Sequence, residues 1–244
     1  MLFVLSGNIQ TGKTRFLCDL LGKIAEAGTA PFGVVAPGVW RDEEGVVAIS
    51  GGFECAEVDA FDWDGAPAGA RDASGFEKLG ICNTLVPGGE TMLFAVRRDI
   101  AQAGGLIDEG AQSEKAQLYW YAFDDVIERE NAHFATACKT GVLAAAGAAG
   151  DPAAGAAPTQ ALLVVDELGR MELLADTGLT EAVALLEAGP TADCPHALVV
   201  VREPLRHLVE ERFGNKWNGY IGIYPEDEDG TACLMSTLRA SVNA

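Results

Sequence analysis

The stretch that decides the fold is Gly7-Asn8-Ile9-Gln10-Thr11-Gly12-Lys13-Thr14, which fits the pattern GxxxxGK[ST] at every fixed position. A short apolar run at residues 2–5 precedes it, and from Thr14 onward apolar side chains recur at helical spacing until Gly28. A second apolar run follows at residues 32–36. The order of strand, glycine loop, helix and strand predicts an α/β fold built on a parallel sheet.

The spacing within residues 7–14 suits the binding of a phosphate chain. Glycines let the backbone curl so that successive N–H groups point at phosphate oxygens, and the following helix adds its positive end. We expect the Lys13 ammonium to reach the outer phosphates and the Thr14 hydroxyl to coordinate Mg²⁺. Arg15 comes directly after the loop, where a side chain either lies near the nucleotide base or is exposed on the surface. The sequence therefore predicts that residues 7–15 bind a nucleotide with Mg²⁺.

Composition limits the partners that the chain can have. It has 244 residues, 49% of them apolar, which is enough for the core of a single domain over residues 1–244. Lys and Arg number 17 against 36 Asp and Glu, so the net charge is −19. A surface this acidic repels nucleic acid and anionic membranes. The predicted partner is a nucleoside triphosphate, ATP or GTP, held by the local charge of the loop.

The cysteines and the apolar runs bear on location. The six cysteines include no CxxC pair and no group with histidines at metal-ligand spacing, which argues against a zinc site and a disulfide framework. The N-terminal apolar run is too short for a signal peptide, and the alanine-rich stretch after Gly141 lacks the bulky side chains of a membrane span. These features predict a cytoplasmic protein with reduced thiols.

A second apolar run, residues 161–165, ends in Asp166-Glu167. An acid at the end of a buried strand, beside a phosphate loop, is typical of a magnesium-binding position, so we expect Asp166 and Thr14 to share the ion. Glu167 lies one residue further out, where a carboxylate can orient and deprotonate an attacking water. The alternative for Glu167 is a solvated acid that caps a helix.

The eight residues Asp166-Glu167-Leu168-Gly169-Arg170-Met171-Glu172-Leu173 resemble the DEIGKMEL block of the THEP-type nucleoside triphosphatases, a family that includes the cancer-related nucleoside triphosphatase of animals. Leu168 replaces Ile and Arg170 replaces Lys, and residues 33–41 loosely resemble the segment after the family's second strand. The resemblance implies a three-layer P-loop NTPase with a mainly parallel RecA-like sheet. It also implies slow, Mg²⁺-dependent hydrolysis of nucleoside 5′-triphosphates to diphosphate and phosphate, with broad base specificity.

Arginines offer positive charge near the predicted reaction centre. Arg170 follows Glu167 by three residues, and we expect it to stabilise the charge on the phosphoryl oxygens. An ion pair with Glu172 or Asp176 is the alternative. Arg202 ends the predicted strand at residues 197–201 and would lie on the same edge of the sheet. Arg41 is a further candidate from the segment shared with the family.

Two regions differ from the rest of the chain in amino-acid composition and pattern. Residues 37–110 alternate short β-like pieces (46–50, 53–58 and 91–96) with Gly, Pro and Asp turns, which predicts a β-ribbon insertion. Residues 144–160 are a low-complexity run of Ala, Gly and Pro, typical of a surface linker. Two late edge strands are predicted at 220–224 and 232–235.

Two other functions would use the same site. A small-molecule or nucleotide kinase needs an acceptor pocket and an arginine-rich lid, and Arg71, Arg97 and Arg98 of the insertion form no evident cluster in the sequence. An NTP-dependent switch would use slow hydrolysis to reset a protein partner. Glu167 directly after Asp166 favours water as the acceptor, so hydrolysis is the leading interpretation.

Overall fold

The computed structural model describes residues 1–7, 12–147, 158–225 and 227–242. The strands are β1 (Leu2–Gly7), β2 (Thr29–Val35), β3 (Gly38–Arg41), β4 (Val47–Ile49), β5 (Glu77–Val86), β6 (Thr91–Arg97), β7 (Trp120–Ala122), β8 (Gln160–Leu168), β9 (His196–Arg202) and β10 (Tyr220–Ile223). The α-helices are α1 (Lys13–Glu26), α2 (Ala56–Ala60), α3 (Arg98–Ala103), α4 (Gln112–Lys115), α5 (Asp124–Thr140), α6 (Val142–Gly147), α7 (Arg170–Leu174), α8 (Thr180–Ala188), α9 (Arg206–Phe213) and α10 (Glu228–Val242).

All described strands join one mixed sheet. Its main path runs β10-β1-β9-β8-β2-β5-β3-β4, with β6 beside β5 and β7 beside β6. The first five strands of this path are parallel to one another. β5 pairs antiparallel with β2, and β3, β4, β6 and β7 continue in antiparallel pairing. The α/β class is confirmed, but the sheet is mixed where a mainly parallel one was expected, because the insertion extends the edge at β2.

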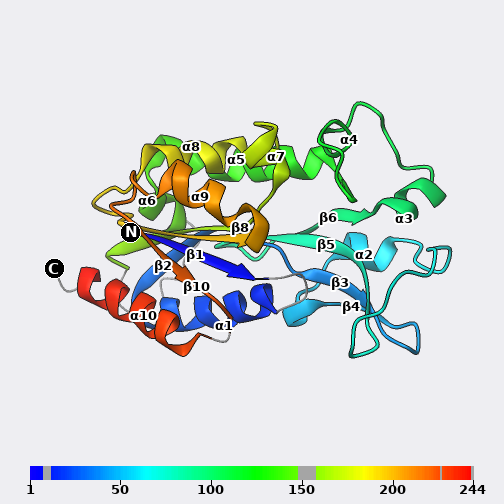
Figure 1. The fold of residues 1–244 in the computed structure, drawn as a ribbon, viewed down its shortest axis with the longest axis horizontal. Helices are drawn as coiled ribbons and strands as arrows, with labels where there is room; N and C mark the ends of the chain where they lie inside the picture. Colours follow the sequence, from blue (N-terminus) through cyan, green and yellow to red (C-terminus); the bar gives the residue numbers. More distant parts are fainter. Residues whose placement is uncertain (8–11, 148–157, 226, 243–244) are drawn as a thin grey trace.

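Helices cover both faces of the parallel strands (Figure 1). Alternate side chains of a strand point to opposite faces, so Leu2 and Val4 of β1 pack in one core while Phe3 and Leu5 pack in the other. The first core is closed by α5, α6, α8 and α9, and the second by α1 and α10. This layering explains why β1, β8 and β9 read as uninterrupted apolar runs.

Residues 37–110, the predicted insertion, contribute most of a separate small core, which Ala111 and Tyr121 complete. Val39 of β3, Leu79 of β5 and Val96 of β6 pack there, and Figure 1 shows these strands reaching away from the helical layers. The strand predicted at residues 53–58 is wrong, because the chain there enters the helix α2. Cys55 and Val58 are three residues apart, and a helical turn brings both of them into this core. The long strand β5 was not predicted.

The C-terminal segment differs from one of the two strands predicted for it. The strand predicted at 232–235 is wrong and lies inside α10, where Gly230, Leu234 and Leu238 are buried at a helical spacing of four. The strand predicted at 220–224 is confirmed as β10. Of the predicted linker, residues 144–147 end α6 and Gln160 begins β8, while 148–157 lie outside the described residues. No helix in the described ranges is long and apolar enough to cross a membrane.

Candidate functional site

The carboxyl ends of three parallel strands bring the predicted chemistry together. Gly7 at the end of β1 pairs with Arg202 at the end of β9, and Val201 of β9 pairs with Leu168 of β8. Asp166 and Glu167 therefore lie one strand away from Arg202 and two strands away from Gly7. In parallel sheets, this edge is where ligands bind. The described residues of the phosphate loop and the acidic strand end share that edge, as the sequence predicts.

Ala36, the residue after β2, connects the two predicted magnesium ligands. Its N–H donates a hydrogen bond of 3.0 Å to Oδ2 of Asp166. Its carbonyl oxygen accepts a hydrogen bond of 3.4 Å from the Thr14 hydroxyl. Thr14 and Asp166 are 152 residues apart in the chain, yet both are held by one residue. Their oxygens thus form a pair at the edge of the sheet.

Lys13 is the first residue of α1, and its buried side chain turns back toward the end of β1. Its Nζ donates a hydrogen bond of 3.1 Å to the carbonyl oxygen of Gly7. Gly12 precedes the helix with φ of +78°, a left-handed conformation that favours glycine. Burial lowers the pKa of the Lys13 ammonium, and the charges of Glu167 and Asp166 oppose this. The predicted phosphate-binding residues Asn8, Ile9, Gln10 and Thr11 lie outside the described residues.

Asp166 is buried, with 1% of its surface exposed. Burial raises the pKa of its carboxyl group to about 7, against the opposing hydrogen bonds of Ala36 and Thr14. A cation at this position would favour the ionised form. Carboxylate and hydroxyl oxygens are ligands that Mg²⁺ prefers, so the pair fits the ion. Within the described ranges no group of three His, Cys, Asp or Glu side chains could hold a metal, so waters and phosphate oxygens would complete the shell.

Glu167 is paired with Arg202. The Arg202 Nε donates a hydrogen bond of 2.7 Å to Glu167 Oε1, and both side chains are partly exposed. The sequence placed Arg202 at this edge without assigning it a partner. The contact means that one carboxylate oxygen of Glu167 is held by a cation.

The side chains of Arg170 and Arg15 are both exposed to solvent. Arg170 is exposed at the start of α7, and neither alternative ion pair is formed. The Glu172 carboxylate accepts hydrogen bonds from the backbone N–H groups of Gly169 and Leu179, and Asp176 faces Arg212. Arg15 is exposed on α1. Their predicted roles therefore stay predictions.

Lys78, the second residue of β5, was not predicted from the sequence as a site residue. Its Nζ lies 5.7 Å from the ring centroid of Trp40 and 5.4 Å from that of Trp120. The charges that act on it are those of Glu167, Arg202, Asp166 and Lys13. No spacing in the sequence reveals this position, because β3, β5 and β7 must first assemble.

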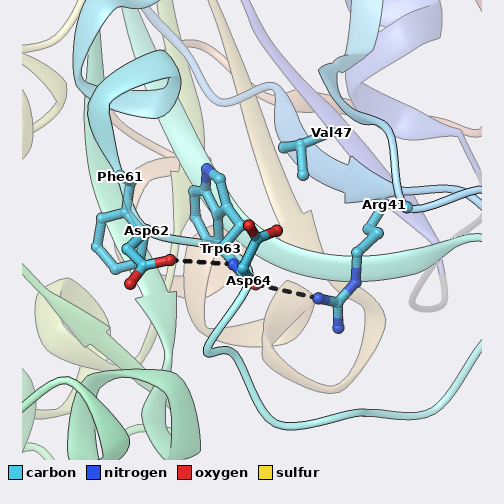
Figure 2. Close-up of a pocket in the computed structure, with 7 residues that line it drawn as sticks. Arg41, Val47, Phe61, Asp62, Trp63 and Asp64 are labelled. Atoms are coloured by element: carbon cyan, nitrogen blue, oxygen red, sulfur yellow. Dashed lines mark hydrogen bonds between the residues drawn. The ribbon is translucent and has the colours of Figure 1, made fainter.

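Arg41 forms its hydrogen bonds within the predicted insertion. Its guanidinium donates hydrogen bonds to Glu77 and to the carbonyl oxygen of Trp63. Figure 2 shows it beside a pocket of about 290 Å³ that also contains Asp62 and Asp64. Because its hydrogen bonds connect β3, β5 and the 62–76 loop, Arg41 has a structural role in this arrangement.

Comparison of the chain with protein-family models, with curated proteins and with solved structures gave no match. The case for a function therefore rests on the geometry of the site.

Proposed function

We propose that this protein is a P-loop nucleoside triphosphatase with a RecA-like core, acting in the cytoplasm on nucleoside 5′-triphosphates with Mg²⁺. The observation that carries the proposal is the link through Ala36. It brings a hydroxyl from the start of α1 and a carboxylate from the end of β8 to one place, beside the loop that fits GxxxxGK[ST]. A phosphate chain bound to that loop would lie next to both oxygens.

Different residues carry the separate steps of the proposed hydrolysis. In this proposal Lys13 and the helix terminus of α1 would bind the outer phosphates, and Thr14 and Asp166 would hold Mg²⁺; the hydrogen bonds of Lys13, Thr14 and Asp166 support this assignment. When bound, Mg²⁺ neutralises charge on the phosphate oxygens. The low exposure of Asp166 and Lys13 keeps water away from these contacts and so strengthens them.

Glu167 is the proposed base. The water oxygen forms a bond to the γ-phosphorus as the bond to the bridging oxygen breaks, so that the diphosphate leaves with the electron pair. Arg202 holds Oε1 of Glu167, and the proposal assigns the proton of the water to the other carboxylate oxygen. Arg170, at the start of α7, is proposed to stabilise the phosphoryl charge. Triphosphatases without an arginine finger hydrolyse at about 10⁻⁴ s⁻¹ and those with an arginine in cis at about 10⁻² s⁻¹. Because the sequence shows no evident arginine finger, we expect a rate on the slow side of this range.

The test is phosphate release from ATP, GTP, CTP and UTP with Mg²⁺, for the wild type, Glu167→Gln and Lys13→Ala. Glu167→Gln should keep nucleotide affinity within a few-fold and lose about 100-fold or more in rate, because the carboxylate that accepts the proton is removed while the amide oxygen can still accept the hydrogen bond of Arg202. Lys13→Ala should lose nucleotide binding. Glu44→Gln, an exposed acid of the insertion, is the matched control.

Two results would contradict the proposal. A wild type that binds no Mg-nucleotide would overturn it entirely. A wild type that binds Mg-nucleotide tightly but releases no phosphate would show that the acceptor is not water or that a partner is required. The kinase and switch alternatives would then take precedence.

A further inference from the structure

Lys78 differs from the other cations of the insertion. Arg41 and Arg97 both donate to the buried carboxylate of Glu77. Arg98 pairs with Glu114, and Arg71 donates to the carbonyl oxygen of Gly75. Among the described residues, Lys78 has no carboxylate within ion-pair distance and lies instead between two aromatic rings.

The two rings hold the ammonium without neutralising it. Trp40 lies opposite Lys78 in the pairing of β3 with β5, and Trp120 belongs to β7. The face of an aromatic ring attracts a cation through its quadrupole and leaves its net charge unchanged. The two rings therefore position the half-buried Lys78 side chain without supplying an anion that would neutralise it.

Lys78 lies close to the candidate site. A Cβ built at Gly38, two residues after Ala36, would come within 3.0 Å of the Lys78 Cε, and the largest charges acting on the ammonium come from site residues. Glu167 and Asp166 attract its charge, while Arg202 and Lys13 repel it. Burial lowers the pKa of the Lys78 ammonium, and the two carboxylates oppose this. Three cations thus gather at a place with two carboxylates, in a chain whose net charge is −19. A polyanion bound among them would relieve the repulsion.

We propose that the Lys78 ammonium contacts the terminal phosphate of a bound nucleoside triphosphate and stabilises the negative charge that develops on its oxygens during cleavage. The inference deepens the proposed function and rests on it. The negative charge of the bound triphosphate favours the charged form of Lys78, which donates hydrogen bonds while the bridging P–O bond breaks and the diphosphate takes the electron pair. The insertion would thereby add a lysine charge in cis to the charge that Arg170 is proposed to supply at the phosphoryl oxygens.

The test compares a triphosphate with a diphosphate. Affinities for Mg-ADP and for the Mg complex of the non-hydrolysable β,γ-imido analogue of ATP are measured for the wild type, Lys78→Met, Lys78→Arg and Lys139→Met. Lys139 is an exposed lysine at the end of α5 and serves as the matched control. Lys78→Met should weaken the triphosphate analogue about 10-fold or more, because a charged hydrogen bond is lost, while ADP affinity stays within about two-fold. Its turnover of ATP should fall, and Lys78→Arg should recover part of both losses.

A measurement on the wild type covers the case in which Lys78→Met does not fold. Acylation of lysines by acetic anhydride, followed by peptide mass spectrometry, should show Lys78 protected by the Mg-triphosphate analogue and much less by Mg-ADP. Equal protection by both nucleotides, or equal affinity losses for both in Lys78→Met, would overturn the inference and restrict Lys78 to packing. Hydrolysis by the wild type would still support the proposed function in that event. A wild type that binds neither nucleotide would overturn both.

Discussion

Asp166 is an acid whose burial works against its own ionisation. The pKa of its carboxyl group rises from an ordinary value of 3.8 to about 7 in the folded chain, chiefly through burial. The unfolded chain therefore releases this proton first as pH rises. Without ligand, the stability that the folded chain gains by holding this proton more tightly than the unfolded chain is fully present below about pH 4. It is lost progressively as the pH rises to about 7. The loss amounts to about 4 kcal/mol at most, since one unit of pKa corresponds to about 1.4 kcal/mol.

Asp166→Asn should remove this pH dependence. The amide oxygen can still accept the hydrogen bond of Ala36, so the variant should match the wild type near pH 4 and exceed it in stability at pH 7.5. Urea unfolding at several pH values, without Mg²⁺ or nucleotide, measures the difference. Asp19→Asn, an exposed acid on α1, is the control. A difference that does not change with pH would contradict the assignment.

At the scale of elements, Glu77 holds the insertion together. Its carboxylate lies 2.8 Å from Arg41 Nη2 on β3 and 2.6 Å from Arg97 Nη1 at the end of β6, and it accepts the N–H of Gly69 at 2.5 Å. Burial opposes ionisation, but these contacts outweigh it and lower the pKa of Glu77. Glu77→Gln would leave the part-buried Arg41 guanidinium without its anion and the buried Arg97 guanidinium with Asp99 alone. We expect a loss of about 3 kcal/mol or more in the stability of the insertion.

Hydrogen exchange resolves where that loss falls. Faster exchange is expected in β3, β5 and the 62–76 loop, with little change in α5 and α8 of the opposite layer. The exposed variant Glu44→Gln should leave the pattern unchanged. Uniform acceleration over the whole chain would show that the insertion and the parallel sheet unfold as one unit, which would contradict the local effect.

At the scale of the whole molecule, the charge of −19 sets a general repulsion. Salt screens charges separated by more than about 10 Å at 0.1 M, while the close ion pairs are weakened less. Raising NaCl from 10 to 300 mM should therefore raise the unfolding temperature by a few degrees. Calorimetry measures it, with sucrose at equal osmolality as the control for uncharged effects. A lower unfolding temperature in salt would mean that attractive pairs dominate the stability.

The sequence by itself determined the order of β1, the loop that fits GxxxxGK[ST] and α1, and the acidic end of β8. These features depend on local spacing: uninterrupted apolar runs, helical periodicity after Thr14, and acids directly after a buried strand. Local spacing also predicted that Gly7, Asp166 and Arg202 would share one edge, because parallel strands carry their carboxyl ends together.

Only the tertiary structure decided the rest. The antiparallel half of the sheet, the pair between Glu167 and Arg202, and the link of Thr14 to Asp166 through Ala36 all join residues that are distant in the chain. The same is true of Lys78, which meets Trp40 and Trp120 only after β3, β5 and β7 have assembled. Strand pairing sets these contacts, and pairing depends on which edges and faces are free once the core has packed, a property that no local pattern of residues contains.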